Sequence, residues 1–509
     1  MWWRGWLTLV KRQAERGRIH DGAALIACLL AGLAAFRQTH DLEWPCDSDF
    51  YRDMGAAQSV LDGDFGGDPA YLGERAWYPP LVPAIVGLAS RITGVALHEA
   101  YTTFGVYLNL LAPAAFSLMA VRLYGRALVL GAFATHERWL AALAGVAAGL
   151  TMLAHAAPAL ILAGVVTAIA LHQLVEGFRD RSRRFRPLAT AAVIGGVTAV
   201  VASPFYGGLA LEYGGKIRNA EPLTWIAGEL TIESLPALLA REVSLRGLVA
   251  LVGLVSLFVP KGLARGRTRV ALLAWFACTC IGLLYGYASQ RMRLPPLMPS
   301  WHFYFYLQAF ESVGFGLGGA VLAGLLSRAG EWALRGRRFD FRVPHVRLLD
   351  ALIAGSLLVV VLRWERYAHR PDLRDYRTQS FVYQKLPDME LYRWALHNAE
   401  PSDVVLAEGG PSFFVAAAGR KVLAVQRLFA NPYLAPEERE RAQRVMLDSL
   451  AEGKFDVFLK YARRYSVRYV AILSGKKKPD WLARSPLKRV HRARRRPGFD
   501  VYAVTASRS

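Results

Sequence analysis

The sequence predicts a polytopic α-helical membrane protein that ends in a small α/β domain outside the cytoplasm. Three features of its 509 residues lead to this prediction. Hydrophobic residues make up 54% of the chain, and they gather into blocks that approach the roughly 20 apolar residues needed to span a bilayer core. Short runs of positive charge separate these blocks. After residue 363 the composition changes to that of a soluble domain.

Nine hydrophobic stretches are interpreted as membrane-crossing helices, because each is apolar over most of the thickness of a bilayer. They lie at about 20–36, 101–121, 139–154, 157–175, 188–205, 246–260, 270–288, 303–327 and 348–363. The sixth is the weakest, since its apolar core runs only from Gly247 to Val259. Together with their loops, these helices form the expected transmembrane domain, residues 1–363.

The distribution of positive charge predicts the orientation of these helices. The N-terminus and the loops assigned to the cytoplasm carry 23 Lys and Arg residues, against nine in the outer loops. Cytoplasmic loops are enriched in Lys and Arg, so the N-terminus is expected inside and, after nine crossings, the C-terminus outside. The excess of positive residues behind the net charge of +22 is therefore interpreted as a signal for membrane orientation, and not for nucleic-acid binding. We expect a multi-pass protein of the bacterial inner (cell) membrane, with no nucleic-acid partner.

The first outer loop, about residues 37–100, is long and acidic. Residues 49–61 are typical of a short helix that lies on the membrane surface. Pro79-Pro80 then opens the moderately apolar stretch Leu81 to Leu97, which Arg91 interrupts. This stretch suits an interfacial helix better than a tenth span.

Residues 364–509 are expected to form the soluble extracytoplasmic domain. Residues 403–407 and 469–473 have the β-branched, hydrophobic composition of strands, and residues 499–504 form a last short strand. Residues 436–450 are a charged amphipathic helix. Strands that alternate with helices predict an α/β fold.

The stretch most informative about function is Cys46-Asp47-Ser48-Asp49-Phe50-Tyr51-Arg52-Asp53, at the outer end of the first span. Two or three carboxylates gather there, and ionisable groups at a membrane face are functional candidates. A carboxylate in this place is suited to act as the general base that deprotonates an acceptor hydroxyl or amine. Alternatively, these acids cap the following helix, because a helix N-terminus favours negative charge. The local pattern supports both interpretations equally.

Residues 47–83, DSDFYRDMGAAQSVLDGDFGGDPAYLGERAWYPPLVP, resemble the first outer loop of the GT-C superfamily of membrane glycosyltransferases. That superfamily includes the protein O-mannosyltransferases and the lipid A aminoarabinose transferases. Its pattern is an Asp four residues before a Tyr, a short helix that ends in a Gly, and later a Tyr followed by Pro-Pro-Leu and a Pro. The matching residues are Asp47, Tyr51, Gly63, Tyr78, Pro79, Pro80, Leu81 and Pro83.

Further patches extend the resemblance. Residues 143–162 are similar to the Gly-rich helix of the family, which usually ends in a basic residue, and His155 stands in that place here. Residues 203–206, Ser-Pro-Phe-Tyr, resemble its Pro-Trp-Tyr corner at the outer surface, and residues 394–406 the start of its periplasmic domain. Many members carry Asp-Glu where this chain has Asp47-Ser48, which leaves the substrate open.

The resemblance implies transfer of a hexosyl or pentosyl group from a polyprenyl-phosphate carrier to a lipid, glycan or protein acceptor outside the cytoplasm. Asp47 is then the preferred base and Asp49 the fallback, while Tyr51 and Tyr78 of the same motif are expected to bind substrate. Arg291 and Arg293, before Pro295-Pro296, are the first choice for the phosphate, because arginine forks match its oxygens. Ordinary interfacial charges explain this pair equally well.

Three more residues are candidates for substrate binding. His302 and Tyr304 belong to the aromatic cluster Trp301–Tyr306, for which an aromatic belt at the membrane interface is the favoured explanation. His155 lies between two spans and, when protonated, would bind phosphate; a histidine at a helix turn without such a role is slightly favoured. Glu311 lies deep in the eighth span, where a carboxylate needs a polar partner or a water-filled cavity.

The sequence indicates no cofactor. No Gly-rich nucleotide loop follows a strand, and no His, Cys or Asp group has the spacing of metal ligands, so a divalent metal is possible in principle but not indicated. The four cysteines form neither a zinc pattern nor a disulfide framework. The alternative function is a transporter or flippase of lipid-linked sugars. Transporters often have repeated halves, and this chain shows no internal repeat.

Overall fold

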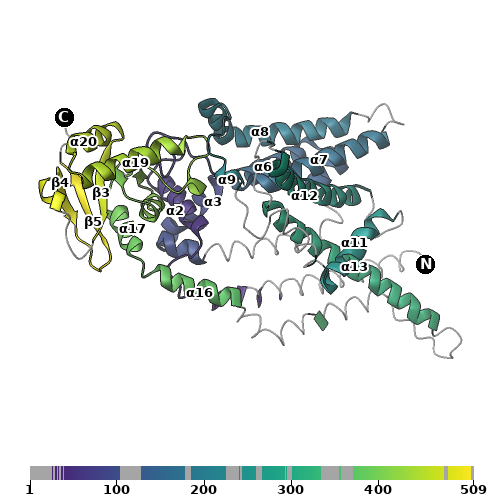
Figure 1. Cartoon of the computed structure of the whole chain (residues 1–509). Helices are drawn as coiled ribbons and strands as arrows, with labels where there is room; N and C mark the ends of the chain where they lie inside the picture. Colours follow the sequence, from purple (N-terminus) through teal and green to yellow (C-terminus); the bar gives the residue numbers. More distant parts are fainter. Residues whose placement is uncertain are drawn as a thin grey trace. The chain divides into compact units, whose positions relative to one another are not determined.

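The computed structural model describes most of the chain between residues 26 and 505. The continuous described ranges are 39–103, 128–177, 185–224, 243–259, 266–292, 301–333, 371–474 and 480–505, and a few isolated residues complete them. The chain forms two compact units (Figure 1). The first, here called the helical unit, comprises residues 1–35, 108–202 and 226–369; the second, here called the mixed unit, comprises residues 36–107, 203–225 and 370–509.

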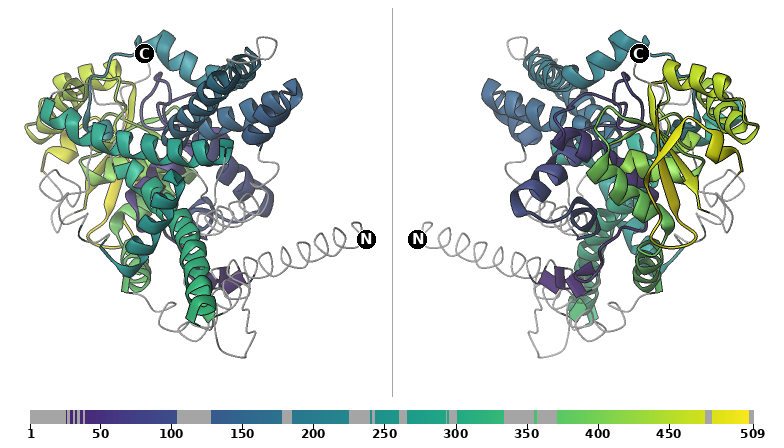
Figure 2. Two further views of the ribbon diagram at one scale, coloured as in Figure 1. Left: turned by 90° about the vertical axis from the view of Figure 1, so that its right-hand side faces the viewer. Right: turned by 90° about the vertical axis from the view of Figure 1, so that its left-hand side faces the viewer.

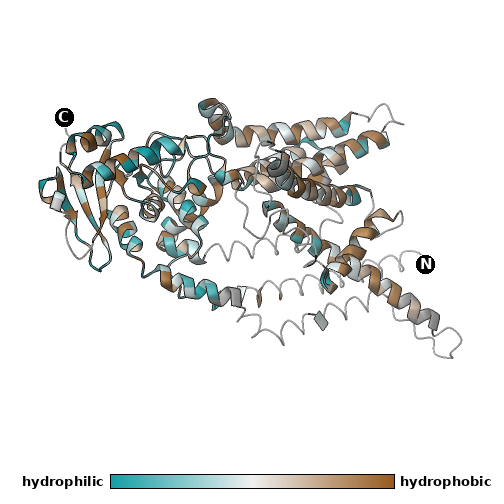
Figure 3. Cartoon of the chain, in the orientation of Figure 1, coloured by the Kyte–Doolittle hydropathy of each residue, from teal (hydrophilic) through white to brown (hydrophobic). Residues whose placement is uncertain are grey.

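The described part of the helical unit consists of α-helices. They are α5 (Leu128–Thr135), α6 (Arg138–Ala154), α7 (Ala156–Glu176), α8 (Arg186–Tyr213, whose last part belongs to the mixed unit), α11 (Leu245–Phe258), α12 (Gly266–Met292) and α13 (Trp301–Ala333). Four of them, α7, α8, α12 and α13, are long and apolar enough to cross a membrane. Their hydrophobic residues are visible along α7, α8 and α12 in Figure 3.

These four helices match four of the nine predicted spans. The apolar helices α6 and α11 coincide with two more predictions, but they have only 17 and 14 residues. The remaining predicted spans, at 20–36, 101–121 and 348–363, fall largely outside the described residues. The number of nine spans and the orientation therefore stay predictions.

Small residues let the helices of the helical unit approach one another closely. A Cβ on Gly253 of α11 would collide with the backbone of Gly314 on α13, and a Cβ on Gly318 would collide with the carbonyl oxygen of Val249. Such Gly-mediated backbone contact is typical of helix pairs in membranes. Beside this contact, Leu257 and Phe310 are buried together with apolar residues of α12.

The predicted boundary between two spans at His155 is confirmed, because α6 ends at Ala154 and α7 begins at Ala156. One expectation from the sequence is corrected in this unit. Residues 203–206 form no corner, since α8 continues through Pro204 to Tyr213. A proline within a helix leaves the carbonyl one turn before it without its usual donor, yet the helix bridges it here.

The mixed unit contains a five-stranded sheet with strand order β2-β1-β3-β5-β4. The strands are β1 (Val404–Leu406), β2 (Lys421–Val422), β3 (Val467–Leu473), β4 (Leu487–His491) and β5 (Phe499–Val504). β1 pairs in parallel with β2 and β3, whereas β5 is antiparallel to both β3 and β4. This mixed sheet confirms the small sheet predicted for the C-terminal segment.

Helices cover both faces of this sheet (Figure 2). On one face, Met446 of α19 (Pro436–Ala451) and Phe458 of α20 (Phe455–Arg464) are buried against Val470 of β3. On the other, Trp394 of α17 (Pro387–Asn398) packs edge-on against Tyr469, with ring centroids 5.1 Å apart. The alternation of Tyr469 and Val470 follows from the two-residue period of a strand.

The remaining elements of the mixed unit come largely from the first outer loop. They are α2 (Ser48–Leu61), α3 (Leu81–Thr93), the short α9 (Glu221–Thr224), α16 (Pro371–Tyr383), α18 (Gly410–Ala417) and two 3₁₀ turns, Arg427–Phe429 and Asp480–Arg484. The loop helices lie where the sequence predicts them. α3 ends at Gly94, whose φ of 72° is the left-handed conformation that glycine adopts most easily.

Buried charges bind the first outer loop to the C-terminal segment. Arg420 and Asp62 form an ion pair of 2.6 Å with side chains only 6% and 17% exposed. Lys421 donates to the carbonyl oxygen of Asp68 at 2.6 Å, and the amide of Asn431 donates to the Asp68 carboxylate at 3.0 Å. Residues 37–100 therefore group with the C-terminal segment and not with the helical unit.

Replacing Arg420 with Ala is expected to destabilise the mixed unit by about 3–5 kcal/mol, because the change leaves a buried carboxylate without its partner. Arg420 also donates to the carbonyl oxygens of Ala399 and Leu396, at 2.7 and 3.1 Å. Unfolding of the full-length protein in detergent, followed by tryptophan fluorescence, measures the change. Lys454→Ala is the matched control, since the Lys454 side chain is 65% exposed; its effect should stay within about 0.5 kcal/mol. Equal effects of the two variants would contradict a structural role for the buried pair.

Candidate functional site

The first turn of α2 presents the two carboxylates singled out from the sequence. Asp47 is the N-cap, and its Oδ1 accepts a hydrogen bond from the backbone N–H of Asp49 at 2.9 Å. This bond satisfies one of the donors that a helix start leaves without a partner. The helix-capping interpretation of Asp47 is therefore confirmed. Asp47 and Asp49 are both exposed to solvent.

Arg52 holds the second carboxylate in place. Its NH1 donates to Oδ1 of Asp49 at 3.1 Å, and its Nε donates to Oδ1 of Asp53 at 2.9 Å. The guanidinium carbon lies 3.7 Å from the centre of the Tyr78 ring, a cation–π contact. One cation thus joins two acids one turn apart and a tyrosine that follows 26 positions later in the sequence.

The three charged groups differ in exposure. The Asp49 side chain is 60% exposed, whereas those of Arg52 and Asp53 are about 15% exposed. Burial raises the pKa of Asp53, although the adjacent Arg52 opposes that rise. Burial also raises the pKa of the Tyr78 hydroxyl to about 12, so this phenol stays protonated at neutral pH. Asp49 is therefore the acid of this group that a substrate can reach, and Asp53 anchors the arginine.

Each exposed acid keeps one oxygen available. Only Oδ1 of Asp47 and Oδ1 of Asp49 have a hydrogen-bond donor among the described residues. Because both residues are exposed, the other oxygen of each carboxylate is available to accept a proton from a bound hydroxyl or amine. This arrangement allows the cap and the base interpretations to hold together, because they use different atoms.

The structure places the two tyrosines of the motif differently. Tyr51 is fully buried, donates its hydroxyl hydrogen to the carbonyl oxygen of Pro45 at 2.7 Å, and packs against Phe414. No surface of Tyr51 is open to a ligand, so the expectation that it binds substrate is corrected to a packing role. Tyr78 is half-buried beneath Arg52 and lines a cavity of about 30 Å³ with Asp53. That volume is the size of a water molecule and too small for a sugar.

In the helical unit, the structure brings two of the predicted histidines together. His155 and His302 stack edge-to-face with ring centroids 4.8 Å apart, and both are half-buried. His155 is the N-cap of α7, where its Nδ1 accepts from the N–H of Ala157 at 3.2 Å. Tyr304 is 8% exposed and packs in an apolar cluster with Phe303. The structure thus gives Tyr304 a packing environment, and its binding of substrate stays a prediction.

The two arginines chosen for phosphate lie at the edge of what the structure describes. Arg291 is in the last turn of α12, with its side chain outside the described atoms, and Arg293 is outside the described residues. Glu311, by contrast, has the partner that its depth requires. Arg246 of α11 donates to both of its carboxylate oxygens, through Nε at 3.0 Å and through NH2.

The Glu311 ion pair adjoins an apolar cavity of about 500 Å³. The cavity lies among α11, α12 and α13, and its lining includes Glu311, Leu251, Phe276 and Leu284. Leu251 and Leu284 are more than half exposed in the helical unit. The cavity is therefore an apolar recess with one charged pair beside it, a combination suited to an amphiphile.

Neither a metal site nor a disulfide is found in the described part of the chain. No group of three His, Cys, Asp or Glu side chains converges there, and Cys46, Cys278 and Cys280 are free thiols. Sequence reasoning missed two elements of the site, the bridging role of Arg52 and the pairing of Arg246 with Glu311. The available signal for Arg52 was its position three residues after Asp49, which places both on one helix face.

No protein-family model matches the sequence, and no curated protein matches it. Among solved structures, the fold is similar to the apo form of the oligosaccharyltransferase of Archaeoglobus fulgidus. The two share 13% sequence identity, the superposition covers 89% of this chain and 69% of that chain, and the TM-score is 0.44.

Two substitutions of Asp47 separate its cap from its charge. Asp47→Ala is expected to cost about 1 kcal/mol of stability, because it removes the cap, whereas Asn caps as well as Asp does. The unfolding midpoint of the full-length protein in detergent should therefore fall for Asp47→Ala and stay near the wild-type value for Asp47→Asn. A similar loss in both variants would mean that the charge of Asp47, and not its cap, stabilises α2.

Proposed function

We propose that this chain is a membrane glycosyltransferase of the GT-C type. It transfers a sugar from a polyprenyl-phosphate donor to an acceptor on the extracytoplasmic side. The observation that supports this most is the pair of exposed carboxylates at the start of α2, held by a capping bond and by the buried Arg52. They stand in the same segment whose sequence resembles the first outer loop of that superfamily.

The proposed reaction is a displacement at the anomeric carbon. The acceptor oxygen or nitrogen forms a bond to this carbon while the bond to the lipid phosphate oxygen breaks. The acceptor proton passes to a carboxylate, and the polyprenyl phosphate leaves with the bonding electrons. Asp47 remains the first choice for this base and Asp49 the second, since both residues are exposed and each has an oxygen to which no described residue donates. Positioned general bases contribute roughly 10²- to 10⁴-fold to a rate.

The apolar recess of the helical unit supports a lipid-linked donor. A polyprenyl chain needs a dry, hydrophobic surface, and the recess of about 500 Å³ among α11, α12 and α13 supplies one. Binding of the donor phosphate is assigned to Arg291 and Arg293, with His155 and His302, which stack on each other, as further cations when protonated. This assignment rests on their place in the sequence.

Asp47→Asn is the sharpest test of the proposed chemistry, because it keeps the helix cap and removes only the proton acceptor. A strain that lacks the gene is complemented with wild type, Asp47→Asn or Asp49→Asn, and its membrane glycolipids and surface glycans are compared by mass spectrometry. If Asp47 is the base, the sugar lost on deletion should return with wild type and be reduced about 100-fold or more with Asp47→Asn. If Asp49 is the base, the strain complemented with Asp49→Asn should show the reduced amount of sugar instead.

Glu43→Gln is the matched control for these variants. Glu43 is another exposed acid of the same loop, and its neutral amide should leave transfer unchanged. Full transfer by Asp47→Asn, by Asp49→Asn and by the double variant would remove both acids from the mechanism. The transporter or flippase would be favoured by a different result. After deletion of the gene, the polyprenyl-linked sugar would then stay on one side of the membrane, while transfer of the sugar to acceptors would be unaffected.

The orientation predicted from the charge asymmetry has a direct test. Alkaline phosphatase fused after Ser509 should be active, because this enzyme matures only outside the cytoplasm, whereas green fluorescent protein at the same place should stay dark when exported unfolded. The reverse pattern would place the C-terminal segment inside and require an even number of spans.

A further inference from the structure

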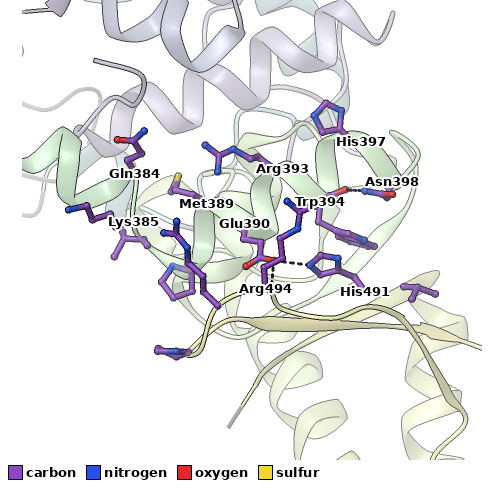
Figure 4. Close-up of a pocket in the computed structure, with 15 residues that line it drawn as sticks. Gln384, Lys385, Met389, Glu390, Arg393, Trp394, His397, Asn398, His491 and Arg494 are labelled. Carbon is purple, nitrogen blue, oxygen red and sulfur yellow. Dashed lines mark hydrogen bonds and ion pairs between the residues drawn. The ribbon is translucent and has the colours of Figure 1, made fainter. Parts of the chain in front are cut away.

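The mixed unit contains a large hollow that the proposed transfer chemistry does not use. It has a volume of about 860 Å³ and lies between α17 and the connection from β4 to β5 (Figure 4). We call it the basic groove. One wall consists of Lys385, Arg393 and His397 from α17 and the turn before it, and the other of His491, Arg494 and Arg495.

The basic groove has a strong excess of positive charge. Four cations line it, Lys385, Arg393, Arg494 and Arg495, against the single carboxylate of Glu390. That carboxylate is already engaged, because it accepts from Nε2 of His491 at 3.3 Å and from the backbone N–H of Arg494 at 2.8 Å. Glu390 thus fixes the second wall against α17 and leaves the cations for a ligand.

The cations themselves have no carboxylate partner in the described part of the chain. The guanidinium of Arg393 lies 5.0 Å from the ring centre of Trp44, which supports its position without neutralising its charge. Arg494 and Arg495 are exposed. Unpaired cations gathered around a hollow create a positive potential that attracts an anion.

The shape and the polar groups indicate the class of anion. A bilayer surface is flat and does not enter a recess, so a discrete ligand fits better than a membrane. Trp394 is only 6% exposed, which leaves no open aromatic face for the base stacking that single-stranded nucleic acid uses. Asn398 donates its amide hydrogen to the carbonyl oxygen of Trp394, so its own side-chain oxygen remains to accept from a hydroxyl.

We propose that the basic groove binds a phosphate-bearing saccharide, which is the acceptor of the transfer reaction. Arginine forks bind the phosphate oxygens bidentately, while the amide and imidazole groups contact the sugar hydroxyls. The identification of this ligand as the acceptor rests on the proposed function, whereas its binding to the groove does not depend on that function. The groove would hold the acceptor by its charge, away from the carbon that reacts.

Binding of defined probes to the full-length protein in nanodiscs of zwitterionic lipid tests this inference without any turnover. The probes are phosphorylated pentamannose, neutral pentamannose and hexaglutamate, and microscale thermophoresis gives their dissociation constants. Phosphorylated pentamannose should bind at least about tenfold more tightly than neutral pentamannose, and its affinity should fall as NaCl is raised, because charge steers and holds it.

The double variant Arg494→Glu/Arg495→Glu should raise the dissociation constant of phosphorylated pentamannose by at least about tenfold, since it reverses two charges of one wall. Lys460→Glu/Arg463→Glu is the matched control, with the same change in charge on exposed residues of α20 outside the groove. An equal loss in the control, or no loss in the groove variant, would overturn the inference. Hexaglutamate that binds as tightly as the phosphorylated sugar would overturn the saccharide assignment.

This outcome is separable from the test of the base. Intact binding in the groove, with no sugar lost from glycolipids or glycans when the gene is deleted, would contradict the proposed function and leave the groove. Lost transfer in the acid variants, with no specific binding in the groove, would contradict only the present inference.

Discussion

The mixed unit depends on charges that are buried between segments more than 350 residues apart in the sequence. Arg420 pairs with Asp62, and Lys421 and Asn431 satisfy Asp68. Such groups cost free energy when they lose water, and they recover it only if every partner is present. Burial raises the pKa of Asp68 from its ordinary 3.8 to about 6. Because the folded protein binds this proton more tightly than the unfolded chain, protonation of Asp68 stabilises the fold. This contribution to stability is fully present below pH 3.8 and is lost as the pH rises through about 6. The contact therefore gives specificity to the pairing of loop and C-terminal segment.

That pairing determines what the first outer loop can do. A loop of some 60 residues with two short helices, α2 and α3, would be mobile alone, because short helices are marginal in water. Here α2 packs so closely on the C-terminal segment that a Cβ on Gly55 would collide with the carbonyl oxygen of Ala416. Tyr51 of α2 is buried against Phe414, which lies on α18 together with Ala416. The start of α2, with its acids, is consequently fixed to a rigid unit, as a general base must be if its proton transfer is to be efficient.

Much of the fold was predictable because its signals are local. The long apolar runs of α7, α8, α12 and α13 and the hydrophobic composition of β5 need no distant information to be recognised. The short strands β2 and β4 and the uninterrupted passage of α8 through Pro204 were not predicted, since tertiary packing decides them. At the site, the acids of α2 were found from their density in the sequence. The position of Arg52 over Tyr78 was not, because a contact between a helix and a later loop leaves no periodic trace.

One residue, Asp47, can serve both as the helix cap and as the proposed base. A helix start needs an acceptor for its unpaired N–H groups, and it favours negative charge. A carboxylate meets the first need with one oxygen and keeps the second oxygen available, whereas a Ser or Thr cap has a single oxygen for both tasks. Arg52 extends the arrangement to Asp49 without closing it, because it binds one oxygen of that acid and is itself held by Asp53 and Tyr78. Two acceptor oxygens thus remain at the exposed start of a helix that buries one face through Tyr51, Met54 and Ala57. This asymmetry, more than the number of acids, makes the first turn of α2 suited to the proposed chemistry.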